Sequence, residues 1–345
     1  MRPPDLDRRA LLRLAGVSLL ATGCRRAGGP PATTLPTSVR RSPSPSPAPP
    51  PPPPPYVPMA GEPVPNCKQA AADFVQTLTT GEGRAGPEAG IARALPLTGA
   101  GFDATAAAAM AGPIFSDVLS RGEIVYPQLG GLIPIAPDAR SASVMVVVRQ
   151  QLISASGRSR EQVRVCDVRL AVQQGQWQVV ELASIGGEPV DRPDVLDPRA
   201  ARVLDDARIE LPDSGRWDVH AGRISLDVLD ILAAAAEQAA VSVTVLRSGH
   251  PRNVFGSTGL SDHTQGRAVD LWRIAGQPVV STGAGAGAGP AGEVLRTAFA
   301  NQRLAQAGSP VGSDLDGPGR RRSFVNLVHK DHLHLAARGR VAPTA

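Results

Sequence analysis

A proline-rich segment near the N-terminus sets the first limit on what this chain can fold into. Residues 25–65 consist mainly of Pro, Ser, Thr and Gly, with an unbroken proline run from Pro49 to Pro55. A segment with so few bulky apolar residues cannot bury a core, and polyproline conformation makes it a stiff spacer of about 3.1 Å per residue. We therefore expect a disordered tether over 25–65, followed by a folded part over 66–345.

The first 24 residues have the pattern of a bacterial export signal. The twin arginines Arg8 and Arg9 precede an apolar run that ends at Ala21, and small residues then lead to Cys24. The apolar run is shorter than the roughly 20 residues that a membrane span requires. The residues before Cys24 resemble a lipoprotein processing box, which implies lipidation of Cys24; ordinary signal cleavage nearby is the alternative. We expect an extracytoplasmic protein of the bacterial cell envelope, attached to the membrane through a lipid anchor.

Charge and cysteine usage narrow the choice of partners. Residues 1–60 contain eight arginines and two aspartates, so the formal charge of +5 belongs to the signal and the tether. We find no basic stripe with interleaved aromatic residues and expect no nucleic-acid partner.

In an oxidising compartment, Cys67 and Cys166 predict a disulfide, which would stabilise the fold by about 4–5 kcal/mol in the chain-entropy model. Two separate buried thiols are the alternative.

Residues 66–188, here called the middle domain, predict a small α+β fold. Helical spacing covers 70–78 and 104–111, and alternating apolar residues then predict strands over 143–153, 162–173 and 177–184. Helices followed by an antiparallel meander are typical of cystatin-like or NTF2-like domains. Nothing in this segment indicates chemistry. We expect it to position the protein or to bind a protein partner.

Residues 199–345, here called the C-terminal domain, follow a linker over 189–198 and predict a second α+β fold. The expected elements are a helix capped by Ser225 and reaching Ala240, strands over 241–246 and 268–274, a glycine-rich loop over 283–289, and a helix over 290–307.

Histidines carry the strongest chemical signal of the chain. His263 and Asp270 lie seven apart around Gly266, which permits a tight turn, and His332 and His334 lie two apart in an alternating pattern. Residues two apart on a strand share a face. A hydrolytic zinc site takes three protein ligands and leaves a fourth position for water. We expect His263, Asp270 and one of the two later histidines as ligands, with the other holding a proton; a hydrogen-bonded His263–Asp270 pair without metal is the alternative.

Two motifs resemble those of a known group of enzymes. The pattern Ser261-x-His263-x-x-Gly266-x-Ala268-x-Asp270 resembles the signature of D-Ala-D-Ala carboxypeptidase-type zinc peptidases, which are related in fold to lysostaphin-type endopeptidases and the hedgehog domain. The pattern His329-x-x-His332-x-His334 resembles penicillin-insensitive murein endopeptidases. The resemblance covers residues 200–345. It implies an antiparallel-sheet fold of the hedgehog and D-Ala-D-Ala peptidase type, one zinc ion, and peptidoglycan peptides as substrate.

Carried over residue by residue, the resemblance implies three metal ligands and three catalytic candidates. His263, Asp270 and His334 would hold zinc, His332 would act as general base, and His329 would be a neighbouring active-site histidine. Asp331 is the alternative base, because carboxypeptidase-type relatives have an acidic residue three positions before the last ligand. In a regular strand Asp331 faces away from His332 and His334, so we favour His332; a bulge would reverse this preference.

The remaining candidates concern substrate binding and support of the loop. His250 and Arg252 could bind a substrate carboxylate or the oxyanion, although related peptidases often have Ser-Gly-x-Arg where Ser248 to Arg252 is one residue longer. Ser261 would fix the loop or orient His263, and His220 has no partner motif and is expected to be structural. We predict a zinc metallopeptidase that hydrolyses peptidoglycan peptides as an endopeptidase or D,D-carboxypeptidase. The alternative is a catalytically silent envelope protein that uses this fold to bind or scaffold wall peptides.

Overall fold

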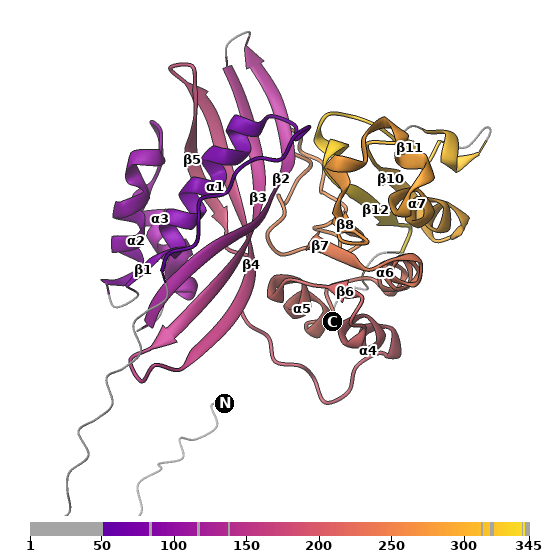
Figure 1. Ribbon diagram of the computed structural model, residues 1–345, viewed down its shortest axis with the longest axis horizontal. Helices are drawn as coiled ribbons and strands as arrows, with labels where there is room; N and C mark the ends of the chain where they lie inside the picture. The colour runs from indigo at the N-terminus through magenta and orange to yellow at the C-terminus, as the bar shows by residue number, and fades with distance from the viewer. Residues whose placement is uncertain are drawn as a thin grey trace, which may run out of the picture. The chain divides into compact units, whose positions relative to one another are not determined.

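The computed structural model describes residues 51–82, 85–115, 118–136, 139–311, 313–317, 321–339 and 341. The export signal, Cys24 and most of the expected tether lie outside these residues. Pro47–Ala345 form one compact unit, built from two sheets and the helices that cover them (Figure 1). The predicted α+β class with antiparallel strands is confirmed.

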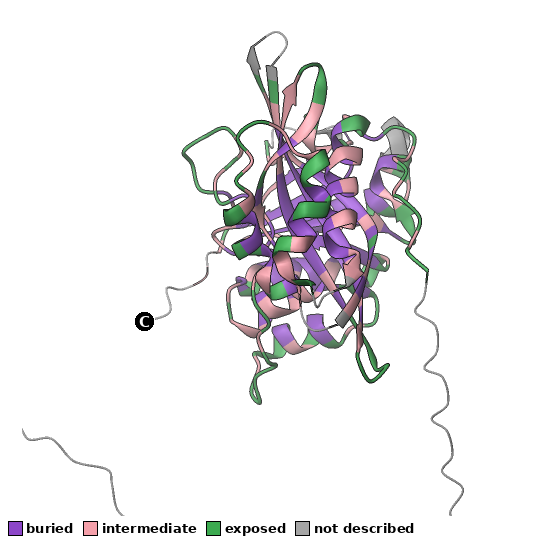
Figure 2. Cartoon of the chain, turned by 90° about the vertical axis from the view of Figure 1, so that its left-hand side faces the viewer, coloured by how far each residue is buried: buried purple, intermediate pink, exposed green. Residues whose placement is uncertain are grey.

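The middle domain contains a five-stranded antiparallel sheet with a helical layer on one face. Its strands pair in the order β1 to β5 and comprise β1 (Gly81–Glu82), β2 (Val118–Ala136), β3 (Ala139–Ser154), β4 (Ser159–Gln173) and β5 (Gln176–Ser184). The helices are α1 (Pro65–Thr79), α2 (Gly86–Ala94) and α3 (Ala104–Ala111). Figure 2 views this side of the molecule and shows exposed residues alternating with buried ones along the helices. Buried residues of α1, including Phe74 and Leu78, form one core with alternate residues of β3 and β4.

A bulge in strand β2 changes the face of the sheet to which its side chains point. Ile124 pairs with Val148 and Tyr126 pairs with Val147, so the ladder gains one extra residue at Val125. Adjacent residues of β3 point to opposite faces. The bulge therefore turns Tyr126 away from the helical core that contains Ile124, toward the C-terminal domain.

The C-terminal domain is built on a mixed sheet in the order β11-β10-β12-β8-β7-β6, with β9 beside β8. The strands are β6 (Ile209–Glu210), β7 (Val241–Val245), β8 (Ala268–Ile274), β9 (Gln277–Pro278), β10 (Leu304–Gly308), β11 (Ser323–Phe324) and β12 (Leu333–Ala337). The helices are α4 (Pro198–Asp205), α5 (Asp213–His220), α6 (Leu226–Gln238) and α7 (Pro290–Ala300). Strands β10, β12, β8 and β7 are antiparallel to their neighbours within this central group.

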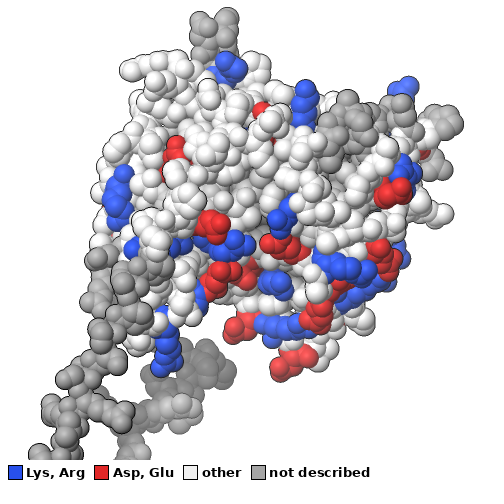
Figure 3. Space-filling view, in the orientation of Figure 1, with Lys and Arg blue, Asp and Glu red and all other residues white. Residues whose placement is uncertain are grey.

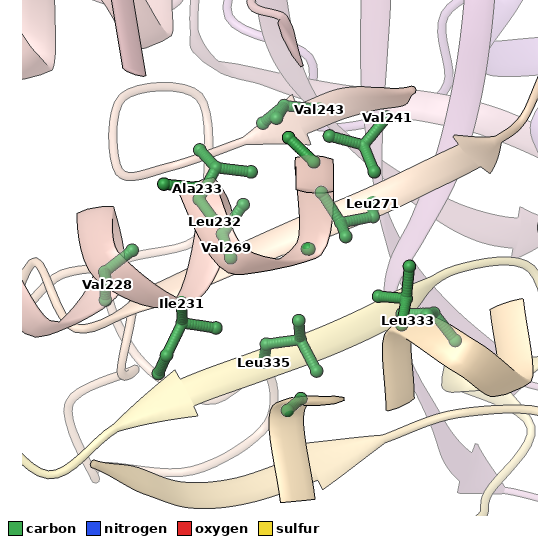
Figure 4. Packing of buried hydrophobic residues seen from close by; sticks show 14 of the residues in the cluster. Val228, Ile231, Leu232, Ala233, Val241, Val243, Val269, Leu271, Leu333 and Leu335 are labelled. Carbon is green, nitrogen blue, oxygen red and sulfur yellow. The ribbon is translucent and has the colours of Figure 1, made fainter. Parts of the chain in front are cut away.

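Helix α6 packs on one face of this second sheet. Ser225 caps the helix by accepting a hydrogen bond from the Val228 amide, as predicted. Leu232 of α6 lies in one apolar cluster with Leu271 of β8 and Leu335 of β12 (Figure 4). The opposite face of the same strands is thereby left for polar residues, because side chains alternate along a strand.

Three expectations for the chain are corrected. The helix predicted over 290–307 ends at Ala300, and β10 follows because it pairs with both β11 and β12. Residues 283–288 of the predicted loop lie within 3₁₀ turns over Val279–Ala288, and Gly289 is the N-cap of α7. The tether predicted to reach residue 65 is packed before that point: Tyr56 contacts the core of the middle domain and Glu62 is buried.

The expected disulfide is absent from the structure. Cys67 of α1 and Cys166 of β4 are free thiols within the same buried apolar cluster. Burial raises the pKa of each thiol to about 12. Both residues act here as small hydrophobic side chains of the core.

Charged side chains of both signs are interspersed on the face shown in Figure 3. Exposed ion pairs of the chain include Arg202–Glu237 and Arg192–Asp205. Among the described residues, no helix combines the length and the hydropathy that a membrane span requires.

Candidate metal centre

Two adjacent strands carry the first two predicted ligands. Asp270 of β8 and His334 of β12 are directly opposite each other in the antiparallel ladder. Their neighbours Leu271 and Leu335 lie in the apolar core of the domain, so Asp270 and His334 occupy the opposite face. The distance from His334 Nδ1 to Asp270 Oδ1 is 2.9 Å.

His263 reaches the same point from the turn before β8. Gly266 has a φ of 66°, and a Cβ there would lie 2.0 Å from the Arg223 carbonyl oxygen, which confirms that the turn requires glycine. His263 Nδ1 lies 2.7 Å from the Leu246 carbonyl oxygen. A carbonyl can only accept, so Nδ1 carries the proton and Nε2 points at Asp270.

The three predicted ligands converge on one point. His263 Nε2 lies 3.1 Å from Asp270 Oδ1 and 3.2 Å from His334 Nδ1. Burial opposes the ionisation of Asp270, but His263 and His332 outweigh it and hold the pKa of this carboxyl well below its usual range. Burial also lowers the pKa of His263, and Asp270 more than offsets this and raises it. The space among these atoms therefore favours a positive charge, which a proton or a metal cation can supply.

His250 adds a further nitrogen beside this group. His250, His263 and Asp270 offer three donor atoms within 4.8 Å of one another, a set that could hold a metal ion. The rings of His250 and His263 are stacked, with centroids 4.1 Å apart and an interplanar angle of 18°. Burial and the neighbouring His263 lower the pKa of His250 well below its usual value, which favours its neutral form.

Asp262 supports His334 from the outer side. Its carboxylate lies 4.0 Å from His334 Nε2, accepts a hydrogen bond from Gln306 Nε2 and forms an ion pair with Arg267. At this distance Asp262 makes no direct hydrogen bond to His334, but its negative charge favours a cation in this part of the site. Sequence analysis missed Asp262 although it is adjacent to His263.

The segment before β12 differs from the predicted regular strand. The strand begins at Leu333, and Asp331 has φ −115° and ψ 2°. A regular strand would turn Asp331 away from His332. In the structure Asp331 instead contacts it, with Oδ1 2.7 Å from His332 Nδ1. Burial opposes the ionisation of Asp331, but Lys68 and His332 outweigh it and lower its pKa to about 2. His332 Nδ1 donates to this carboxylate, and Nε2 faces Asp270 Oδ2 at 3.7 Å.

His329 lies beside the cluster, as predicted. Its Nδ1 is 2.7 Å from Asn326 Oδ1, and its ring centroid lies 5.0 Å from that of His332 and 5.5 Å from that of His334. Burial and the two histidines lower the pKa of His329 to about 2. His329 is thus a neutral wall residue in this arrangement.

A pocket of about 260 Å³ opens onto these residues. It is lined by His250, Ser261, His263, Asp270, His329, His332 and His334 together with apolar residues that include Leu129, Met145, Val254 and Phe324. Ser261 Oγ accepts a hydrogen bond from the His263 amide and lies 3.3 Å from His250 Nδ1, which agrees with its predicted support of the loop. Arg252 is exposed and is not among the lining residues. His220 lies elsewhere, with Nδ1 2.7 Å from the Val190 carbonyl oxygen.

The middle domain also contributes to the site, which sequence analysis did not predict. Gln128 Nε2 donates to Asp270 Oδ2 at 2.6 Å, and Lys68 Nζ lies 2.8 Å from Asp331 Oδ2. Lys68 occupies the same helical face as Ala71 and Val75, which are buried. A lysine on an apolar helical face was the available signal, because lysine is almost never fully buried unless it is paired.

Around one pocket the cluster thus provides imidazole nitrogens of His263, His334 and His250 and a carboxylate oxygen of Asp270. Beside them lies the hydrogen-bonded pair of Asp331 and His332, here called the Asp–His pair. This combination can bind a divalent cation and move a proton beside it. Neither a scan against protein-family models nor a search of curated proteins found a match to this chain.

Proposed function

We propose that this protein is a zinc metallopeptidase of the bacterial cell envelope that hydrolyses peptide bonds of peptidoglycan. The convergence of His263 Nε2, Asp270 Oδ1 and His334 Nδ1, with no pair more than 3.2 Å apart, is the observation that carries the proposal. The two motifs that resemble D-Ala-D-Ala carboxypeptidases and murein endopeptidases lend it further support.

The three atoms fit zinc in type and spacing. Bonds of about 2.0–2.1 Å to tetrahedral zinc place neighbouring ligand atoms about 3.3 Å apart, close to the distances among these three. Two imidazoles and one carboxylate are ligands that zinc commonly takes in catalytic sites. When bound, zinc lowers the pKa of a water to about 7, so that a hydroxide nucleophile is available at neutral pH.

His334 fits the third ligand position better than His250 does. The lone pair of an imidazole nitrogen lies in the plane of its ring, so two nearly parallel rings cannot both direct a nitrogen at one ion. His250 stacks on His263 at 18°, whereas the His334 ring is inclined to His263 by 59°. We assign His250 to the pocket wall, where its neutral ring could contact the substrate.

His332 is the general base of the proposed reaction. Its Nδ1 proton is donated to Asp331, which leaves the Nε2 lone pair directed toward the ligand cluster. There Nε2 can take a proton from the attacking water and deliver it to the leaving amine. Asp331 accepts hydrogen bonds from Lys68 and His332. We therefore assign it the role of orienting His332 and not that of the base.

The pocket suits a small apolar substrate group. About 260 Å³ bounded by Leu129, Val254 and Phe324 accommodates a side chain such as the methyl group of alanine, in line with the resemblance to D-Ala-D-Ala peptidases. The extracytoplasmic location and the lipid anchor at Cys24 remain predictions from the sequence. Together they would place the enzyme within reach of the cell wall.

The test is mass spectrometry of fragments released from purified peptidoglycan. The full chain carries Cys24→Ser to keep it free of lipid, and each reaction is run with and without a chelator and with zinc restored. We expect new peptide termini that disappear with chelator and return with zinc. His332→Ala should retain zinc and lose at least about 100-fold in rate, whereas His220→Ala, a histidine outside the pocket, should keep full activity.

Zinc binding is measured separately by thermal unfolding. Zinc at 100 times its dissociation constant should stabilise the protein by about 2.7 kcal/mol, and His263→Ala should abolish the effect. If folded, zinc-loaded protein releases nothing from any wall preparation, the peptidase proposal fails and the envelope scaffold is the better interpretation.

A further inference from the structure

A lysine from the middle domain is buried against the proposed catalytic pair. The Lys68 side chain is fully buried and its Nζ lies 2.8 Å from both Glu62 Oε2 and Asp331 Oδ2. Buried ion pairs contribute little to stability when compared with apolar residues of similar volume. The core would lose little if Lys68 and its partners were apolar, so their presence beside His332 calls for another role.

The middle domain fixes Asp331 on almost every side. Besides Lys68, the Leu129 amide donates to Asp331 Oδ2 at 3.3 Å, and the Tyr126 hydroxyl donates to the Asp331 carbonyl oxygen at 3.1 Å. These bonds leave Oδ1 free to accept the His332 Nδ1 proton at 2.7 Å. The orientation of His332 therefore depends on residues more than 200 positions away in the sequence.

Gln128 acts in the same way on the ligand Asp270. Its Nε2 donates to Oδ2 at 2.6 Å, so that Oδ1 faces His263 and His334. The Gln128 Oε1 atom is buried and has no hydrogen-bond partner among the described residues. An orphaned buried oxygen costs roughly 1–3 kcal/mol, which an apolar residue would avoid.

We propose that the middle domain completes the active site: Lys68 holds Asp331 and thereby the tautomer of His332, and Gln128 orients the metal ligand Asp270. Both are positioning residues, since neither contacts the reacting atoms. The inference rests on the proposed function for its catalytic consequence. It adds a role to the prediction that the middle domain positions the protein or binds a partner, which stays a prediction.

The test compares full-length Cys24→Ser proteins that differ in one further change each. Lys68→Met removes the cation and Lys68→Arg retains it. Glu62→Gln combined with Lys68→Met preserves the buried net charge in case Lys68→Met does not fold. Gln128→Leu removes the bond to Asp270, and Gln150→Leu is its matched control, because Gln150 is an equally buried glutamine of the same sheet whose bonds go to Ile114, Ser120 and Gln162.

Three measurements separate positioning from stability. Imidazole ¹⁵N NMR of metal-free protein reports the His332 tautomer, competition with a chelator reports zinc affinity, and peptide hydrolysis reports kcat and KM. We expect Lys68→Met and the double variant to lose the single Nδ1–H tautomer of His332 and at least tenfold in kcat, with KM within twofold. Lys68→Arg should restore both in part. Gln128→Leu should weaken zinc binding by 10- to 100-fold, and Gln150→Leu should leave all three readouts unchanged.

An unchanged tautomer and kcat in the folded Lys68 variants would overturn the role of Lys68. Zinc affinity equal in Gln128→Leu and Gln150→Leu would overturn that of Gln128. If even the unsubstituted protein cleaves no peptidoglycan, the proposed function fails, while the tautomer and the zinc affinity still decide whether the middle domain organises the site.

Discussion

Gly266 shows how a single residue determines where a ligand can lie. The turn that carries His263 needs a left-handed backbone at this position, and the Arg223 carbonyl oxygen passes too close for any side chain. A Cβ would have to push apart the turn and the segment before α6. The position of His263 thus depends on the absence of a side chain at Gly266.

We predict that Gly266→Ala destabilises the fold more than Gly276→Ala does. Both glycines have positive φ, but a Cβ at Gly276 meets nothing within 4 Å. Gly276→Ala should therefore cost only the backbone strain of about 1–2 kcal/mol, and Gly266→Ala should cost about 1–3 kcal/mol more because of the clash. Urea unfolding of the two variants measures the difference. Equal losses would show that the turn at Gly266 can relax.

Among the helices and strands, those fixed by local sequence signals were predicted best. The predicted strand over 268–274 and helix over 104–111 match β8 and α3, because an apolar strand pattern and the Gly112-Pro113 stop are local. Strand β2 was missed because Pro127 and Pro134 argue against a strand. They are tolerated there because most of β2 lies at the edge of its sheet, paired on one side only.

The same limit applies to the site. The motifs predicted His263, Asp270, His332 and His334, since their spacing follows from one turn and two strands. Gln128 depends on the bulge at Val125 and on the packing of two sheets, and neither has a local signature. The bonds from Gln128 to Asp270 and from Lys68 to Asp331 therefore could not be predicted from the sequence.

Strand β4 contains a buried carboxyl group that should make stability depend on pH. Burial raises the pKa of Asp167 from 3.8 to about 6, although Arg169 and Ser143 oppose the shift. Because the folded state holds this proton more tightly than the unfolded state does, stability falls as pH rises from about 4 to 6. At neutral pH the folded state has lost about 3 kcal/mol of stability relative to a pH well below 4.

Asp167→Asn should remove this dependence. We expect Asp167→Asn to raise the free energy of unfolding, relative to the unsubstituted protein, by about 2.4 kcal/mol more at pH 7 than at pH 4. Urea titrations at both pH values measure it, and all other titrating groups cancel in the comparison. A difference that does not change with pH would mean that Asp167 is ionised at little cost.

The packed part of the chain begins before the predicted domain boundary at residue 66. Tyr56 is hydrogen-bonded to Glu62, which pairs with Lys68. Removing residues 1–50 should leave thermal stability unchanged, whereas removing residues 1–65 takes away the bond from Glu62 to Lys68 and the packing of Tyr56. Lys68 keeps Asp331 as its partner, so we expect a loss of roughly 1–3 kcal/mol, and the shorter chain should unfold about 2–5 °C lower.

Scanning calorimetry of the two truncated chains checks this, with Glu62→Gln in the longer chain as a control for the ion pair alone. Equal transition temperatures would show that residues 51–65 are only a spacer, as the sequence suggested.

The bond between Lys68 and Asp331 joins positions 263 residues apart. Closing so long a loop is entropically costly until the intervening structure has formed, and contacts of this range slow folding. We therefore expect the bond between Lys68 and Asp331 to form only after both domains have folded. In the proposed enzyme, a chain in which only one of the two domains had folded would lack the bonds that hold Asp331 and His332, and it would be inactive without any separate inhibitor.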